Sequence, residues 1–136
     1  MKYALDTNIV IRYVRVDPVV GTRVENALAQ GVCIPQVVDY EIRRGLSVVK
    51  VPSIKRERLY SYLRKQCPLV ALKTSTWEIA IQVYKTLRQK GFTIGEMDIL
   101  IAAICLENDL ILVTNNTKDF SNIDGLRLEN WTQHQN

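Results

Sequence analysis

Residues 99–106 form a run of eight uncharged and mostly apolar residues in the second half of the chain. Such a run suits either a central strand or a helix that is buried on nearly all of its sides. Glu96 and Asp98 precede the run, and acidic residues favour a helix start because the helix N-terminus carries a partial positive charge. We therefore predict a buried helix here, with Asp98 as a carboxylate in its first turn.

Shorter apolar segments alternate with helical stripes along the rest of the chain. Strands are predicted at residues 2–5, 32–34, 69–72, 110–114 and 126–131, and helices at 18–31, 36–49, 53–67 and 75–91. The last strand alternates like an edge strand, and residues 115–120 are predicted as a polar loop. Strands that alternate with helices indicate an α/β fold with a parallel or mostly parallel sheet. The length of 136 residues predicts a single domain, residues 1–136.

Two helix starts are predicted from polar side chains that commonly cap helices. Thr7 or Asn8 is expected to cap a first helix, although the β-branched residues 9–11 could equally continue the first strand. Ser75 or Thr76 is expected to cap the helix that follows the third strand. Both predictions place a polar residue beside the end of a strand.

The composition excludes several kinds of chemistry. The three cysteines stand singly in apolar surroundings, which indicates reduced core residues of a cytosolic protein rather than disulfides or a zinc site. The only histidine, His134, lies in a polar tail, so histidine catalysis is not expected. Asp6 interrupts the first apolar segment before a signal peptide could form, and no uncharged run is long enough to span a membrane. We expect a soluble, cytoplasmic protein.

Positive charge is concentrated in residues 43–65, which we call the basic segment. It carries eight basic residues and one acid, so its net charge is +7 while the rest of the chain is −3. A basic lobe beside an acidic remainder fits a polyanionic partner such as RNA. A solvated helix face is the alternative for any single residue of the segment.

Polar residues follow two of the predicted strands. Asp6 ends the first strand, Asn116 and Asp119 follow the strand at 110–114, and Asp98 begins the helix before that strand. The carboxyl ends of parallel strands meet at one edge of a sheet, where ligands bind. Carboxylates that converge there repel one another unless a cation is present. Oxygen ligands without histidine or cysteine favour Mg²⁺ or Mn²⁺, which suits metal-assisted phosphodiester hydrolysis.

Four segments together carry a resemblance to a known family. They are Leu5–Asn8, Tyr40–Gly45, Asp98–Ala103 and Val113–Phe120, in this order along the chain. The sequence resembles the PIN domain and, more narrowly, the VapC toxins of VapBC toxin–antitoxin pairs. This resemblance implies a three-layer α/β/α fold with a central, mostly parallel sheet flanked by helices. It also implies a Mg²⁺-dependent endoribonuclease that is inhibited by a VapB-type antitoxin and forms a homodimer.

The resemblance also assigns the site. Asp6, Glu41 and Asp98 match the family's acidic metal-binding core; from the residues alone, Glu41 could instead be a surface acid paired with Arg44. Many PIN domains carry a further acid where this chain has Asn116. Asp119 either substitutes for it, directly or through water, or caps the following turn. The catalytic residues implied are Asp6, Glu41, Asp98, Asn116 and Asp119, with Mg²⁺ or Mn²⁺ held by the first three.

The Thr-Asn-Asn sequence at residues 114–116 resembles the VapC branch that cuts transfer RNA, including initiator transfer RNA. Thr7 and Thr114 are hydroxyls that could orient the carboxylates, or could merely cap a helix and end a strand. Trp77 and Trp131 are predicted to be packing residues. A catalytically inactive PIN module that binds RNA or a protein remains the alternative function, and a phosphoaspartate enzyme is disfavoured by the asparagine at position 8.

Overall fold

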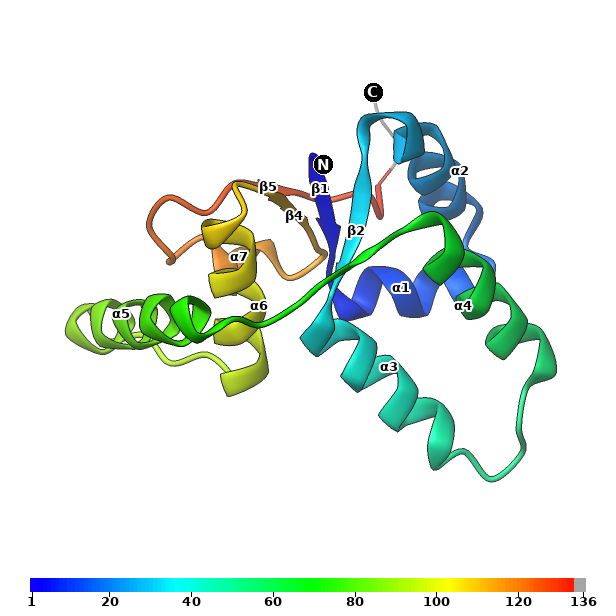
Figure 1. The fold of residues 1–136 in the computed structure, drawn as a ribbon, viewed down its shortest axis with the longest axis horizontal. Helices are drawn as coiled ribbons and strands as arrows, with labels where there is room; N and C mark the ends of the chain where they lie inside the picture. Colours follow the sequence, from blue (N-terminus) through cyan, green and yellow to red (C-terminus); the bar gives the residue numbers. More distant parts are fainter. Residues whose placement is uncertain (134–136) are drawn as a thin grey trace.

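The computed structural model describes residues 1–133; His134 lies outside the described residues. Five parallel strands form one sheet in the order β3-β2-β1-β4-β5 (Figure 1). The strands are β1 (Tyr3–Leu5), β2 (Val32–Pro35), β3 (Leu69–Val70), β4 (Ile111–Val113) and β5 (Leu128–Glu129). The predicted parallel sheet is confirmed, and the strand predicted at 126–131 lies at its edge.

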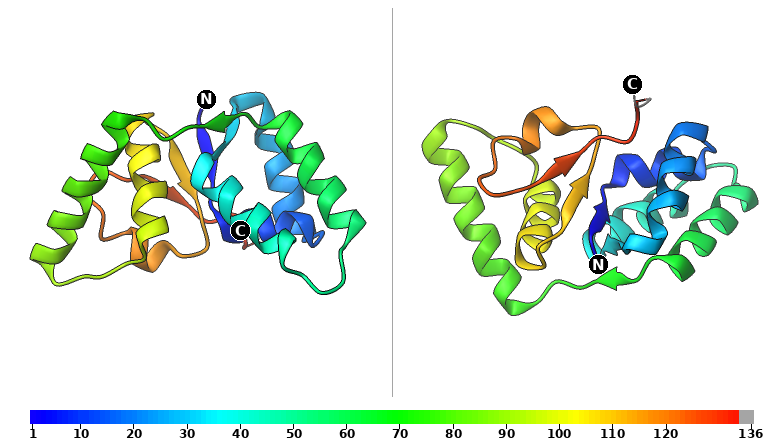
Figure 2. Two further views of the ribbon diagram at one scale, coloured as in Figure 1. Left: turned by 60° about the horizontal axis from the view of Figure 1, so that its bottom comes forward. Right: turned by 90° about the horizontal axis from the view of Figure 1, so that it is seen from above.

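At least one helix connects each strand to the next, and the helix between β4 and β5 is a single turn. The helices are α1 (Thr7–Val14), α2 (Pro18–Ala27), the 3₁₀ helix η1 (Leu28–Gln30), α3 (Gln36–Ser47), α4 (Ile54–Gln66), α5 (Thr74–Lys90), α6 (Glu96–Glu107) and α7 (Thr117–Phe120). Helices α5 and α6 pack together on one side of the molecule, and α1 packs with α2, α3 and α4 on the other (Figure 2). The sheet is therefore flanked by helices, as predicted.

Helix α6 is the buried helix that the apolar run predicts. Its side chains at Ile101, Ala102, Ala103, Ile104 and Cys105 have no exposed surface. It packs against α5 and contacts β2 and β4, so apolar neighbours surround it on most of its sides. Its N-terminus, with Asp98 in the first turn, points toward the carboxyl ends of the strands (Figure 1).

Two predicted helix caps are wrong. Helix α1 is capped by Asp6, whose side chain accepts a hydrogen bond from the Thr7 backbone N–H, rather than by Thr7 or Asn8. The β-branched residues 9–11 are helical because Ile9 and Val10 are fully buried on one face of α1. Helix α5 begins at Thr74, after Lys73, rather than after Ser75 or Thr76.

Two further predictions need correction. Residues 115–120 contain the short helix α7 and are not only a loop. Trp131 is buried against Tyr3, with 5.0 Å between the ring centroids, but Trp77 is 50% exposed. Thr76 and Ala80 lie on the buried face of α5, and Trp77 falls outside that face. Among residues 1–133, no helix combines the length and the apolar character needed to cross a bilayer.

Candidate active site

Asp6 stands at the carboxyl end of β1 and is only 3% exposed. Its Oδ1 accepts the Thr7 backbone N–H at 2.8 Å, and its Oδ2 accepts the Thr114 hydroxyl at 2.7 Å and the Asn8 amide at 2.9 Å. A carboxylate offers about four lone-pair sites, so these three bonds leave one acceptor site on Oδ1. Burial raises the pKa of Asp6, against the effect of the three donors, and the charge of Glu41 raises it further.

The Glu41 side chain extends from α3 toward Thr7, the residue that follows Asp6. Its Oε1 accepts the Thr7 hydroxyl at 2.7 Å, so Thr7 holds Asp6 with its backbone and Glu41 with its side chain. The alternative ion pair with Arg44 is not formed within residues 1–133; the Arg44 guanidinium lies instead over the Tyr40 ring, 5.1 Å from its centroid. The Thr7 hydroxyl thus donates to Glu41 and the Thr114 hydroxyl donates to Asp6, which agrees with the predicted role of these hydroxyls in orienting carboxylates.

Asp98 contributes the third carboxylate, from the first turn of α6. Burial raises its pKa to about 6, and the negative charges of Asp6, Glu41 and Asp119 add to this effect. Asp6 follows β1, Glu41 lies in the second turn of α3, and Asp98 and Asp119 lie in the first turns of α6 and α7. The charges of the other three acids all act on Asp98. The structure thus brings together the acids that the sequence assigned to one site.

Asn116 and Asp119 lie beside this group on the β4–α7 segment. The Asn116 backbone N–H donates to the Thr114 hydroxyl oxygen at 2.9 Å, and its side-chain amide donates to Asp119 at 3.3 Å. Asp119 is exposed, and it follows Asn116 at the first turn of α7. These two residues form the solvent-facing side of the acidic group.

The four acids have no basic partner within the part of the chain that the structure describes. Within residues 1–133, none of the ion pairs includes Asp6, Glu41, Asp98 or Asp119. In the same residues, no three histidine, cysteine or acidic side chains lie close enough together to form a ready-made metal cage. Mg²⁺ needs no such cage, because it binds proteins through one or two carboxylates and retains several waters. The oxygen-only donor set therefore fits a hydrated Mg²⁺ or Mn²⁺ ion.

One buried acid was missed by the sequence reasoning. Asp39 on α3 is 6% exposed, and its carboxylate accepts hydrogen bonds from the Tyr60 hydroxyl at 2.6 Å and from Arg64 at 3.2 Å. Arg43 lies 3.6 Å from its second oxygen. The only available signal was its place between Val38 and Ile42 on the apolar stripe. Asp39 thus links α3 to α4, and its ion pairs involve two of the eight basic residues of the basic segment, Arg43 and Arg64.

Comparisons with known proteins agree with this geometry. The PIN domain family model matches residues 3–126. Ribonuclease VapC2 of Rickettsia felis is 31% identical over 133 residues, which cover 96% of this chain and 98% of the relative. The tRNA(fMet)-specific endonuclease VapC of Shigella flexneri is 31% identical over 136 residues, covering 97% and 99%. The chain belongs to the PIN domain family, among the VapC ribonucleases.

Solved VapC structures share the fold over almost their whole length. A structure of VapBC2 from Rickettsia felis, bound to a DNA fragment from its promoter, matches with a TM-score of 0.88 and 28% identity, covering 96% of this chain and 99% of that chain. DNA-bound VapBC from Salmonella typhimurium matches with a TM-score of 0.82 and 26% identity, covering 96% and 98%. The three-layer PIN architecture implied by the resemblance is therefore confirmed.

Proposed function

We propose that this chain is a divalent-metal-dependent endoribonuclease and the toxin of a type II toxin–antitoxin pair. One observation carries the proposal: the charges of Asp6, Glu41 and Asp119, from distant parts of the chain, act on the partly buried Asp98, and none of these four carboxylates forms an ion pair within residues 1–133. A charge arrangement of this kind requires a cation from outside the chain or protonation of its members. The relatives' names give the reaction class, RNA cleavage.

Asp6, Glu41 and Asp98 are the residues that we assign to Mg²⁺, directly or through its retained waters, with Mn²⁺ as an equivalent ion. When bound, the ion lowers the pKa of the attacking water and stabilises charge on the phosphodiester. Thr7 and Thr114 fix the carboxylates of Glu41 and Asp6, so these side chains need little rearrangement during the reaction.

The remaining two members of the site act at its outer side. Asn116 and Asp119 are assigned to orient water and the scissile phosphate from the α7 side of the site. Their contact with each other at 3.3 Å sets the direction of the Asp119 carboxylate. Asn116 cannot itself carry the negative charge of the acid that it replaces, so we assign no separate second metal site to this pair.

The substrate that we assign is transfer RNA, with initiator transfer RNA as the specific candidate. The support is the relative from Shigella flexneri, which is named a tRNA(fMet)-specific endonuclease. Six bases of the basic segment are exposed and form no ion pair within residues 1–133; they are Arg44, Lys50, Lys55, Arg56, Arg58 and Lys65. Such bases supply the salt-dependent attraction that a phosphate backbone needs.

Two protein partners are part of the same proposal. The first is a VapB-type antitoxin, since the similar solved structures are VapBC complexes. We propose that an arginine of this antitoxin reaches the carboxylates in place of the ion. The second is another copy of this chain. Trp77, Ile81 and Tyr84 are about half exposed at i, i+4 and i+7 along α5, which gives an apolar stripe suited to a homodimer contact. We place this single-domain protein, residues 1–136, in the cytoplasm.

The proposal is tested by inducing the chain in bacteria with and without its antitoxin and mapping the 5′ ends of the cleaved RNA. We expect new ends within transfer RNA, their loss on co-expression of the antitoxin, and their loss in purified reactions that contain EDTA. Asp98→Asn is the inactive control. An inactive PIN module would instead bind RNA in a gel-shift assay and produce no new ends with any divalent ion, which would reject the proposal.

A further inference from the structure

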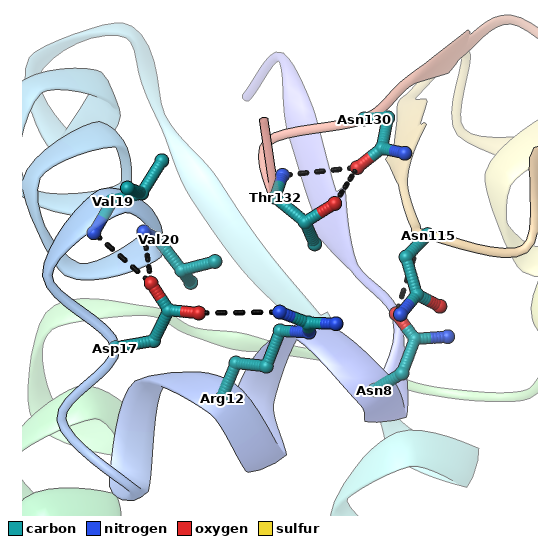
Figure 3. Close-up of polar contacts among 8 residues, drawn as sticks. All are labelled: Asn8, Arg12, Asp17, Val19, Val20, Asn115, Asn130 and Thr132. Atoms are coloured by element: carbon teal, nitrogen blue, oxygen red, sulfur yellow. Dashed lines mark hydrogen bonds and ion pairs between the residues drawn. The ribbon is translucent and has the colours of Figure 1, made fainter. Parts of the chain in front are cut away.

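Asn8 connects the two segments that carry the acidic site. Its amide nitrogen donates to Asp6 Oδ2 at 2.9 Å and lies 3.4 Å from the Thr114 hydroxyl oxygen. Its amide oxygen accepts the backbone N–H of Asn115 at 3.1 Å, the contact drawn in Figure 3. One side chain at the start of α1 thus reaches both the first acid and the β4–α7 segment.

The orientation of this amide is fixed by its surroundings. The Asp6 carboxylate only accepts hydrogen bonds, so the amide nitrogen must face it. The Asn115 backbone N–H only donates, so the amide oxygen must face that group. If the amide were flipped, its oxygen would face the Asp6 carboxylate and its NH₂ group would face the Asn115 backbone N–H. Asparagine is therefore matched to this position at each of its polar atoms.

The residues held by these two ends are members of the site. Asp6 is the buried carboxylate with one free acceptor site, and Asn115 directly precedes Asn116, which contacts Asp119. The hydrogen bond between Asn8 and Asn115 joins residues that are 107 positions apart in the sequence. The distance between the buried acid and the outer pair therefore depends on Asn8.

We propose that Asn8 is a positioning residue, which sets the separation between Asp6 and the Asn116–Asp119 segment and thereby the geometry for metal and phosphate. This inference rests on the proposed ribonuclease function. Aspartate at position 8 would keep an acceptor for Asn115 but would set a second carboxylate against Asp6 Oδ2. Alanine would remove both contacts. The two variants thus separate the link to Asp6 from the link to Asn115.

The test compares Asn8→Ala and Asn8→Asp with the wild-type protein. For Asn8→Ala we expect kcat for RNA cleavage to fall about 10- to 100-fold, the range seen when partners of metal ligands are removed, with KM for RNA unchanged. Amide hydrogen exchange at Asn115, followed by NMR, should be about tenfold faster in Asn8→Ala because its acceptor is lost. In Asn8→Asp the exchange should stay slow while kcat still falls.

Asn130→Ala is the matched control. Asn130 lies in the same region and its side-chain oxygen accepts two hydrogen bonds from Thr132, but neither contact involves a site residue (Figure 3). Asn130→Ala should keep the wild-type kcat and Asn115 exchange rate. A wild-type kcat in Asn8→Ala would overturn the proposal. So would a fall in kcat that is explained by partial unfolding at the assay temperature.

The role of Asn8 can be tested even if the proposed ribonuclease function is wrong. If the wild-type protein cleaves no RNA with any divalent ion, the ribonuclease proposal fails by itself. Mn²⁺ binding, measured by calorimetry without RNA, and Asn115 exchange then decide the role of Asn8. Weaker Mn²⁺ binding together with faster exchange in Asn8→Ala supports the link, and wild-type values for both reject it.

Discussion

Asp6 and Asp39 are both buried carboxylates, but their surroundings differ in charge. Asp39 is enclosed by Arg64, Arg43 and the hydroxyl of Tyr60, so its negative charge is balanced within the chain. Asp6 is held by two neutral side chains and a backbone N–H, and it faces other acids. A buried charge is stable only when it is paired or coordinates a metal.

Under the proposed function, this difference separates an acid that stabilises the fold from an acid that binds the metal ion. Asp39 joins two helices and needs nothing from outside the chain. Asp6, Glu41 and Asp98 form no ion pair within residues 1–133, and burial together with the charges of the other acids raises the pKa of Asp98. Burial alone would not have distinguished the two acids. The charge of the neighbouring groups does.

The largest change in RNA cleavage is expected when the negative charge of Asp98 is removed. Asp98→Asn keeps the size and burial of the side chain but removes the carboxylate that we assign to the metal. Because a bound divalent ion would stabilise the charge that develops on the phosphodiester in the transition state by several kcal/mol, initial rates of RNA cleavage should fall roughly 1000-fold. Asp124→Asn, at an exposed acid paired with Lys90, should keep the wild-type rate. Equal rates for Asp98→Asn and wild type would remove Asp98 from the mechanism.

The second prediction concerns the contribution of Asp39 to the free energy of unfolding. Asp39→Ala leaves the Arg64 guanidinium and the Tyr60 hydroxyl without their shared acceptor, so the free energy of unfolding should fall by about 3 kcal/mol. Urea unfolding at neutral pH measures this change. Asp124→Ala, which breaks an exposed ion pair, should cost less than about 1 kcal/mol. If Asp39→Ala were no less stable than Asp124→Ala, the Asp39 contacts would not hold α3 to α4.

The pH dependence of stability gives the third prediction. The folded-state pKa of Asp98 is about 6, above its ordinary value of 3.8, so the folded protein binds this proton more tightly than the unfolded chain. Without divalent ions, the stabilising effect of protonated Asp98 is present below pH 3.8 and is lost as the pH rises through about 6. Urea unfolding in EDTA across this range should show the loss in wild type and a weaker one in Asp98→Asn. Identical pH profiles would contradict the assignment.

The smallest predicted effect comes from Thr7. Thr7→Val removes the hydroxyl that donates to Glu41 and keeps the backbone N–H that donates to Asp6. We expect cleavage to slow about tenfold, since Glu41 loses a fixed orientation, and stability to change by about 1 kcal/mol or less. Thr22→Val, at an exposed position on α2, is the control for the change in shape. An unaltered cleavage rate would show that Glu41 needs no fixed orientation.

The parts of the site that could be predicted are those encoded by local patterns. The apolar run of α6 and the short apolar strands before Asp6 and Asn116 are continuous over a few residues, so the strand ends and the polar residues that follow them could be predicted from the sequence. The Asp39 contacts could not be predicted, because they depend on how α4 lies against α3. The Asn8 bridge depends on the pairing of β1 with β4, and the exposure of Trp77 depends on which face of α5 packs inward.

A divalent ion bound by Asp6, Glu41 and Asp98 should stabilise the folded protein, so the thermal stability of the free protein with and without the ion tests the proposed metal site. Mn²⁺ at about 100 times its dissociation constant should stabilise the fold by about 2.7 kcal/mol and raise the melting temperature by roughly 10 °C. Asp6→Asn should show little or no increase. A wild-type melting temperature that does not respond to Mn²⁺ or Mg²⁺, or an equal rise in Asp6→Asn, would contradict the account.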